Sequence, residues 1–148
     1  MGDSMKHLVL SKKLIQKNIG KIKRASSIYS TSAWGNIKQE DFMNQVIVVE
    51  TTNTASDTMK AILEIEQQMG RIRTKKNAPR IIDIDILFFN KDIIQSKSLV
   101  VPHPLLQERN FVLTPLNELS PLFIHPVFNK TIHELLIKCT DKLMVKKK

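Results

Sequence analysis

The chain is poor in cysteine, glycine and aromatic residues, and each shortage excludes a class of protein. Its 148 residues include one cysteine, Cys139, four glycines and 5% aromatic residues. One cysteine excludes an intramolecular disulfide framework and a metal cluster held by cysteines alone. None of the glycines opens a G-x-x-x-x-G-K loop, which excludes a Walker-type phosphate cradle. No apolar run approaches the roughly 20 residues of a membrane-spanning helix, and we expect a cytoplasmic protein with no membrane partner.

What the sequence does contain is a globular composition with an excess of positive charge. Hydrophobic residues make up 42% and charged residues 25%, close to the averages of globular domains. We expect one domain over residues 1–148. Lysine plus arginine number 23 against 14 acidic residues, for a net charge of +9. This balance favours an anionic partner such as a phosphorylated small molecule, although a basic tail, Lys146 to Lys148, inflates the sum.

The hydrophobic pattern predicts alternating helices and strands. Apolar residues at helical spacing predict helices over residues 4–19 and 54–69, ended by Gly20 and Gly70, and a short helix over 132–137. Apolar and β-branched runs predict strands over residues 21–31, 42–51, 81–89 and 111–116, with a short one over 99–101. We expect residues 42–51 to be buried on both faces and residues 105–109 to form one helical turn. This order indicates an α+β domain with helices on a mainly antiparallel sheet.

Two aspartates, Asp83 and Asp85, interrupt the apolar run that we expect to form a strand. Side chains alternate along a strand, so both carboxylates share one face, with Cα atoms ~6.6 Å apart. Such a pair can hold two metal ions together with substrate phosphates, and hard oxygen ligands favour magnesium. The alternative is the solvated face of an amphipathic edge strand. Against it, aspartate has poor β-propensity, and like charges on one face repel.

Arginines surround this pair in the sequence. Arg71, Arg73 and Arg80 precede it, and Arg109 follows it, near His103. The forked donors of arginine match phosphate oxygens bidentately. Carboxylate-held magnesium beside several arginines supplies the charge neutralisation and positioning that phosphoryl transfer needs. His103 lies between two prolines and could hydrogen-bond a phosphate, although a lone histidine is more often structural.

Five sequence blocks are recognisable together. They are S-S-I-Y-S-T from Ser26, D-F-M-N from Asp41, G-R-I-R from Gly70, A-P-R-I-I-D-I-D-I-L from Ala78, and V-P-H-P from Val101 followed by R-N-F-V from Arg109. In this order they closely resemble the 6-hydroxymethyl-7,8-dihydropterin pyrophosphokinase family, over essentially the whole chain. The resemblance implies a ferredoxin-like α+β fold. It also implies transfer of pyrophosphate from ATP to the hydroxymethyl group of the dihydropterin, giving AMP, in folate synthesis.

The resemblance further implies a role for each matched residue. Asp83 and Asp85 are expected to bind two magnesium ions and, with Arg71 and Arg80, to be catalytic. Phe42 and Phe111 are expected to sandwich the pterin ring, Asn44 to read its edge, and Thr31 to complete the pocket. The residues expected to bind ATP are Glu66, Arg71, Arg73, Arg80, His103 and Arg109. The expected partners are ATP and the dihydropterin, without nucleic acid, and the chain is expected to be a monomer.

The match differs from the family at its beginning. Members of the family open with an apolar strand and a G-S-N-x-G-D turn, and Met1, Gly2 and Asp3 align with only the end of that turn. We therefore expect the first, central strand to be absent, with a start assigned at an internal methionine as the preferred explanation and a truncated chain as the second. Because buried unpaired backbone groups are costly, such a chain is expected to be poorly soluble or to borrow a strand.

Two other functions remain open at this point. One is an inactive paralogue that binds pterin or nucleotide without turnover. The other is a small basic RNA-binding domain, but the low aromatic content and the aspartates on the predicted strand argue against it. Magnesium-dependent turnover of the pterin separates all three.

Overall fold

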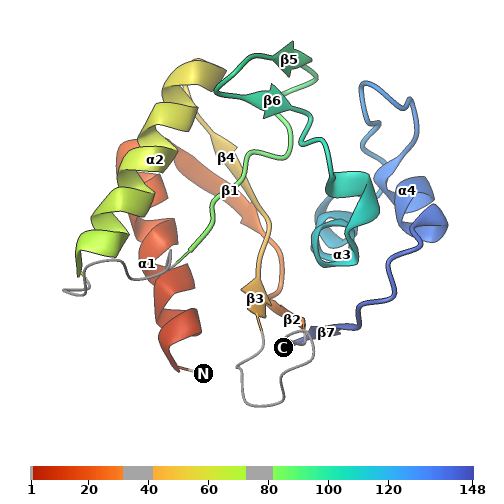
Figure 1. Cartoon of the computed structure of the whole chain (residues 1–148), viewed down its shortest axis with the longest axis horizontal. Helices are drawn as coiled ribbons and strands as arrows, with labels where there is room; N and C mark the ends of the chain where they lie inside the picture. The colour runs from red at the N-terminus through yellow and green to blue at the C-terminus, as the bar shows by residue number, and fades with distance from the viewer. Residues whose placement is uncertain (1, 32–41, 73–81) are drawn as a thin grey trace.

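The computed structural model describes residues 2–31, 42–72 and 82–148 (Figure 1). Within these ranges the chain mixes helices with short strands, and every strand pairing is antiparallel. The α+β class expected from the sequence is therefore confirmed. The elements in chain order are α1 (Gly2–Asn18), β1 (Lys21–Ala25), β2 (Tyr29–Thr31), β3 (Phe42–Asn44), β4 (Ile47–Glu50), α2 (Ala55–Ile72), β5 (Ile94–Gln95), β6 (Val100–Val101), η1 (Leu106–Glu108), α3 (Asn110–Leu119), α4 (Ile132–Lys138) and β7 (Val145–Lys147).

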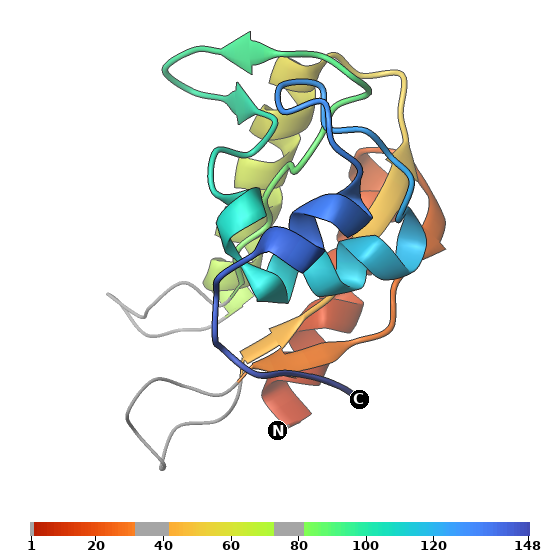
Figure 2. The same ribbon diagram turned by 90° about the vertical axis from the view of Figure 1, so that its right-hand side faces the viewer.

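The described strands form three small sheets. β1 pairs with β4, with Lys21 opposite Glu50 and Ala25 opposite Ile47. β2 lies between β3 and β7, and β5 pairs with β6. Helices α1 and α2 pack together on one side of β1 and β4, while α3 and α4 lie on the other side of the molecule (Figures 1 and 2).

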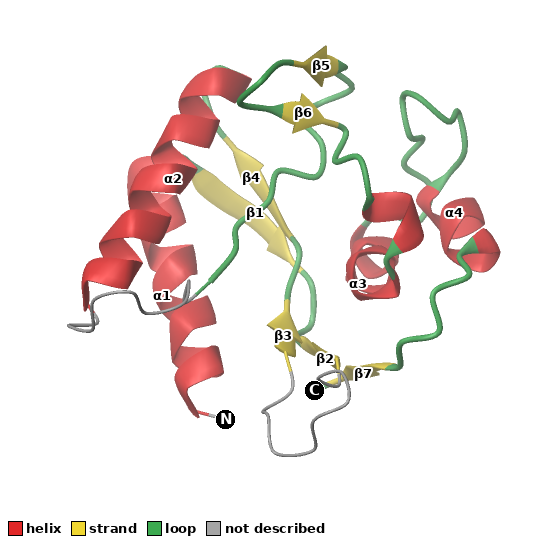
Figure 3. Cartoon of the chain, viewed as in Figure 1, coloured by secondary structure: helices red, strands yellow, loops and turns green. Residues whose placement is uncertain are grey.

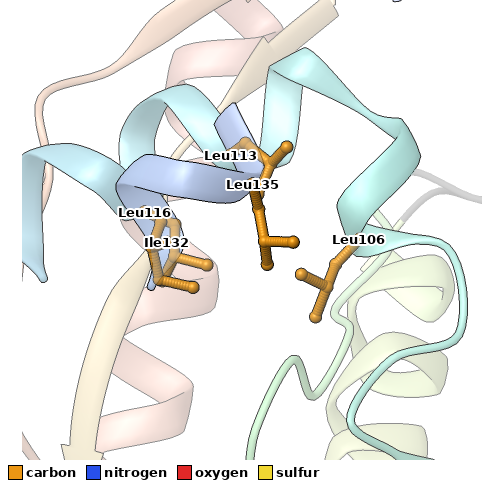
Figure 4. Packing of buried hydrophobic residues seen from close by; sticks show 5 residues of the cluster. All are labelled: Leu106, Leu113, Leu116, Ile132 and Leu135. Carbon is orange, nitrogen blue, oxygen red and sulfur yellow. The ribbon is translucent and has the colours of Figure 1, made fainter. Parts of the chain in front are cut away.

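Each of these two halves of the molecule, α1–α2 with β1 and β4 and α3–α4 with η1, has a hydrophobic cluster of its own. Around α1 and α2, the buried side chains of Ile15, Ile65 and Met69 pack against half-buried residues of β1 and β4. Around α3 and α4, five buried side chains from η1, α3 and α4 point toward one another (Figure 4). They are Leu106, Leu113, Leu116, Ile132 and Leu135. The space between the two halves is lined by side chains of both.

The strand predicted over residues 111–116 is wrong, because these residues belong to helix α3. Leu113, Leu116 and Leu119 are buried at spacings of three, which places them along one side of a helix. A short apolar run has no periodicity that separates a buried helix from a buried strand. The packing against α4 decides in favour of the helix.

The strand predicted over residues 81–89 is also not formed in its described part, which runs as a loop from residue 82 to β5 (Figure 3). Its backbone groups have other partners. The amide of Ile84 donates to Glu66 Oε2 at 2.7 Å, and the carbonyl of Leu87 accepts from the amide of His103 at 2.9 Å. Contacts with a helix side chain and a proline-flanked loop thus replace a strand ladder.

The predictions over residues 21–31 and 42–51 are right in type but miss a break in each. Ser26 causes both breaks. Its amide donates to the carbonyl of Val46 at 2.8 Å, and its Oγ accepts from the amide of Val46 at 3.0 Å, so a side chain interrupts the ladder. β4 is also not buried on both faces, because Val48 and Glu50 are exposed.

The helix ends were predicted less well than the helices. α1, α4 and the turn η1 lie within a few residues of their predicted bounds. α2 continues through Gly70 to Ile72, so Gly70 does not end it. None of the described helices is long and apolar enough to cross a membrane.

Gly20 and Gly70 are expected to respond in opposite ways to replacement by alanine. At Gly20, a Cβ would collide with the backbone carbonyl of Glu50 where β1 meets β4. At Gly70, a Cβ would meet nothing within 4 Å, and alanine in a helix is favoured by ~0.5–1 kcal/mol. Gly20→Ala should therefore lower the free energy of unfolding, and Gly70→Ala should raise it by up to about 1 kcal/mol. Urea denaturation of both variants checks this, and equal shifts would contradict it.

Candidate functional site

The aspartate pair keeps the alternation that the sequence predicts. Asp83 and Asp85 are exposed, while the isoleucines between and beside them are half-buried. Ile82 and Ile84 pack against the cluster formed by α1 and α2. Because Glu66 of α2 also accepts the amide of Ile84, the backbone between the two aspartates is anchored to the α1–α2 side by both packing and a hydrogen bond. The two carboxylates are thus presented to solvent from a fixed segment.

His103 lies close enough to Asp85 and Arg109 for their charges to act on it. Burial is the main cause that lowers the pKa of His103. The carboxylate of Asp85 opposes this, and the guanidinium of Arg109 adds to it. The Nδ1 atom of His103 accepts from the amide of Leu105 at 3.2 Å. The neutral ring therefore carries its proton on Nε2 and can donate it to an oxygen.

These charges give a prediction for the titration of His103. In magnesium-free protein its pKa should lie below the usual value for histidine. Asp85→Asn should lower the pKa further, because it removes the charge that stabilises the imidazolium ion. Arg109→Ala should raise it, because it removes a charge of the same sign. NMR titration of the ring protons checks both shifts, and a pKa unmoved by either variant would show that the three groups lie apart.

Arg109 and Phe111 come together at the beginning of α3. The guanidinium carbon of Arg109 lies 5.6 Å from the centroid of the Phe111 ring, within the range of a cation–π contact. Asp141 holds this end of the helix. Its Oδ2 accepts from the amide of Asn110 at 2.9 Å, and its carbonyl accepts from Asn110 Nδ2 at 2.6 Å. A carboxylate at a helix N-terminus is also favourable for the helix dipole.

Three of the residues expected around the pterin lie on one face of the pair β2–β3. Thr31 is opposite Phe42, and Tyr29 is opposite Asn44. Directly opposed residues point to the same side of an antiparallel pair, as do residues two apart along a strand. Asn44 Nδ2 also donates to Thr31 Oγ1 at 3.5 Å. Thr31 is buried, whereas Phe42 is 58% exposed.

One cavity of about 490 Å³ brings candidate residues from both halves together. Its walls include residues 82–90 and residues of α1, α2, β4 and α3. Four of the residues singled out from the sequence line it: Asn44, Asp83, Asp85 and Phe111. The volume falls within the ~300–1,000 Å³ of typical small-molecule sites.

The other candidates have different positions. Thr31, Phe42, Glu66, His103 and Arg109 lie on the neighbouring segments and do not line the cavity itself. Arg71 belongs to the last turn of α2. Arg73 and Arg80 lie outside the described residues.

Sequence reasoning missed two carboxylates that contact the segments bearing these candidates. Asp141 caps the beginning of α3, and Glu118 bonds to Ser27 and to Tyr29 of β2. Both contacts join residues far apart in the chain. No local pattern signals them, and only the folded arrangement shows them.

The donor set around the aspartates fits a hard divalent cation in part. Within the described ranges, no three histidine, cysteine, aspartate or glutamate side chains gather into a metal-binding group. The exposed carboxylates of Asp83 and Asp85 are the oxygen ligands that magnesium prefers. Magnesium usually keeps several waters and binds one or two carboxylates plus substrate phosphates. The pair therefore suits an ion that arrives with a phosphorylated substrate.

Comparison with known proteins gives consistent matches. The sequence model of the family described as 7,8-dihydro-6-hydroxymethylpterin-pyrophosphokinase (HPPK) matches residues 1–121. The chain is 34% identical over 134 residues to the 2-amino-4-hydroxy-6-hydroxymethyldihydropteridine pyrophosphokinase of Aquifex aeolicus, covering 90% of this chain and 83% of that one. It is 36% identical over 121 residues to the Synechocystis protein of the same name, covering 80% and 62%.

A further relative is a much longer protein. The chain is 38% identical over 135 residues to the folic acid synthesis protein FOL1 of Dictyostelium discoideum. That match covers 91% of this chain but only 20% of the length of FOL1.

Proposed function

The chain belongs to the HPPK family, whose reaction is the transfer of pyrophosphate from ATP to hydroxymethyldihydropterin in folate synthesis, and we propose that the cavity between β4 and residues 82–90 is where this chain carries out that transfer. The family expected from the sequence motifs is thereby confirmed. The observation that carries the proposal for the site is the shared lining of this cavity by Asn44, Asp83, Asp85 and Phe111.

The phosphates of ATP bind on the side of the cavity that carries the two aspartates. Asp83 and Asp85 would hold two magnesium ions, which when bound neutralise and orient the phosphate oxygens of ATP. His103 donates from Nε2 to a phosphate oxygen, since its Nδ1 is occupied by the amide of Leu105. Arg109 adds a forked, permanently charged donor nearby. Arg71, Arg73 and Arg80 complete the grip on the phosphates, with Glu66 on the nucleotide side.

The pterin side is formed by β2, β3 and α3. Phe42 is an exposed ring on β3 and Phe111 a half-buried ring on α3, and a flat heterocycle gains by stacking on such rings. The amide of Asn44 can both donate and accept, which suits the mixed donors and acceptors at a pterin edge. Thr31 holds that amide through its hydroxyl. Binding both substrates at one cavity places the hydroxymethyl group beside the phosphates.

Residues 1–148 form one ferredoxin-like domain that works as a monomer on its two small substrates. The mixed α+β architecture and the two clusters on either side of the cavity support the single domain.

A product assay tests the proposed function. The purified chain is incubated with ATP, 6-hydroxymethyl-7,8-dihydropterin and magnesium, and the nucleotides and pterins are separated by chromatography. AMP and the pterin diphosphate should appear in equal amounts, and neither should form when magnesium is replaced by a chelator. ADP with a pterin monophosphate would contradict pyrophosphate transfer. Binding of both ligands without turnover would identify the chain as the inactive paralogue.

A further inference from the structure

Glu118, near the end of α3, makes a cluster of hydrogen bonds to β2 and the residues before it. Its Oε1 accepts from the hydroxyl of Tyr29 at 2.7 Å. Its Oε2 accepts from the hydroxyl of Ser27 at 3.0 Å, and the amide of Ser27 lies 3.1 and 3.2 Å from the two oxygens. The partners are 89 and 91 residues away in the sequence. One side chain thus joins α3 to the strand β2.

The charge states of Glu118 and Tyr29 favour a strong hydrogen bond between them. The hydrogen bond from Tyr29 is the main cause that lowers the pKa of Glu118; Ser27 and Lys147 act in the same direction, and burial opposes them. Burial, helped by Glu118, raises the pKa of Tyr29 to about 12. Around neutral pH the carboxylate is therefore ionised and the phenol is protonated. Hydrogen bonds of this charge-assisted kind are among the stronger ones in proteins.

The contact lies between the two surfaces that carry the proposed pterin residues. Tyr29 shares its face of β2–β3 with Thr31, Phe42 and Asn44, because Thr31 is two residues along the strand and the others are the opposed partners. Phe111 comes seven residues before Glu118 in α3, which is close to two full turns, so both lie on one side of the helix. The face of β2 that bonds to Glu118 is thus the face of the pterin residues, and the side of α3 that carries Glu118 is that of Phe111.

We propose that Glu118 is a positioning residue for the pterin: its bonds to Tyr29 and Ser27 fix the β2–β3 face, with Phe42 and Asn44, relative to Phe111 on α3. This proposal rests on the proposed function, because it takes these residues as the pterin site. Two aromatic plates on separate elements bind a flat ring only when their spacing is held. A misplacement of about 1 Å at such a site can cost up to about a hundredfold in rate. ATP is held mainly from the aspartate side, with Arg109 at the beginning of α3, so its binding should depend far less on this spacing.

The test compares pterin and ATP in three variants. Glu118→Ala should raise the KM and the Kd for the dihydropterin by about tenfold or more, with the KM for ATP within a factor of about 2. Tyr29→Phe, which removes one bond of the cluster, should show a smaller change of the same selectivity. Glu118→Gln, which keeps the acceptor for Tyr29, should restore most of the affinity for the pterin.

Glu134→Ala is the matched control. Glu134 is another exposed carboxylate, and it accepts from the amide of Thr131 at 2.9 Å in the capping box of α4. Its removal should lower the melting temperature without changing either KM. If Glu118→Ala weakens both substrates equally, or changes only the melting temperature as Glu134→Ala does, the positioning role is overturned. A parent chain that turns over no pterin would overturn the proposed function, and this inference with it.

Discussion

Replacing Asp83 or Asp85 by alanine is expected to lower kcat for pyrophosphate transfer by about a thousandfold or more while the chain still folds. The charge stabilisation that a bound metal supplies at a phosphoryl centre amounts to several kcal/mol, and each 1.36 kcal/mol is a factor of about ten in rate. Both side chains are exposed, and the backbone between them is anchored through Ile84 and Glu66. Replacing an exposed carboxylate leaves no cavity and keeps the hydrogen bond between the amide of Ile84 and Glu66, so the chain should still fold.

The measurement is kcat at saturating magnesium, together with the melting temperature of each variant. Asp92→Ala is the control, because Asp92 is an exposed aspartate of the turn that follows the same segment and does not line the cavity. It should keep the parent activity. Activity within tenfold of the parent in Asp83→Ala or Asp85→Ala would exclude the two-metal role. Loss of activity in all three variants would point instead to a general effect of charge.

The long helices could be predicted from the spacing of apolar residues along the sequence. α1 and α2 carry apolar stripes over more than four turns, and both were predicted in type and approximate length. The alternation around Asp83 and Asp85 survives although no strand forms there, because packing of the isoleucines on α1 and α2 fixes the side-chain directions. The chemistry at this segment could therefore be predicted when its secondary structure could not.

The errors lie where distant contacts decide. The run of residues 111–116 is short and apolar, so its pattern fits a strand as well as a helix. Its burial against α4 decides in favour of the helix. The basic residues at the C-terminus form β7, opposite β2, with Lys147 facing Tyr29. Lysine has low β-propensity, so the pairing with β2, which lies far away in the sequence, accounts for this strand. Glu118 and Asp141 act across 89 and 31 residues, beyond the reach of any periodicity.

Truncating Phe111 or Phe42 to alanine is expected to weaken binding of the dihydropterin by roughly tenfold, and binding of ATP far less. Each ring would lose its stacking contact, which contributes on the order of 1 kcal/mol beyond the area buried. The two variants should differ in stability. Phe42 is 58% exposed in the free protein, so Phe42→Ala should lower the free energy of unfolding only a little. Phe111 lines the cavity and contacts Arg109, so Phe111→Ala should lower it more. Phe111→Ala should therefore also show a small loss for ATP, through Arg109.

Titration of each variant with both ligands, followed by fluorescence or calorimetry, measures this selectivity. Phe128→Ala is the matched control, because Phe128 is a partly exposed ring outside the cavity that contacts His125, with centroids 4.5 Å apart and the ring planes tilted by 32°. It should leave both affinities unchanged. Phe111→Leu keeps an apolar side chain without the flat ring, so it should restore stability but not pterin affinity. Equal losses for pterin and ATP in Phe42→Ala and Phe111→Ala would mean that the rings only pack the protein, and the pterin would then have to bind elsewhere.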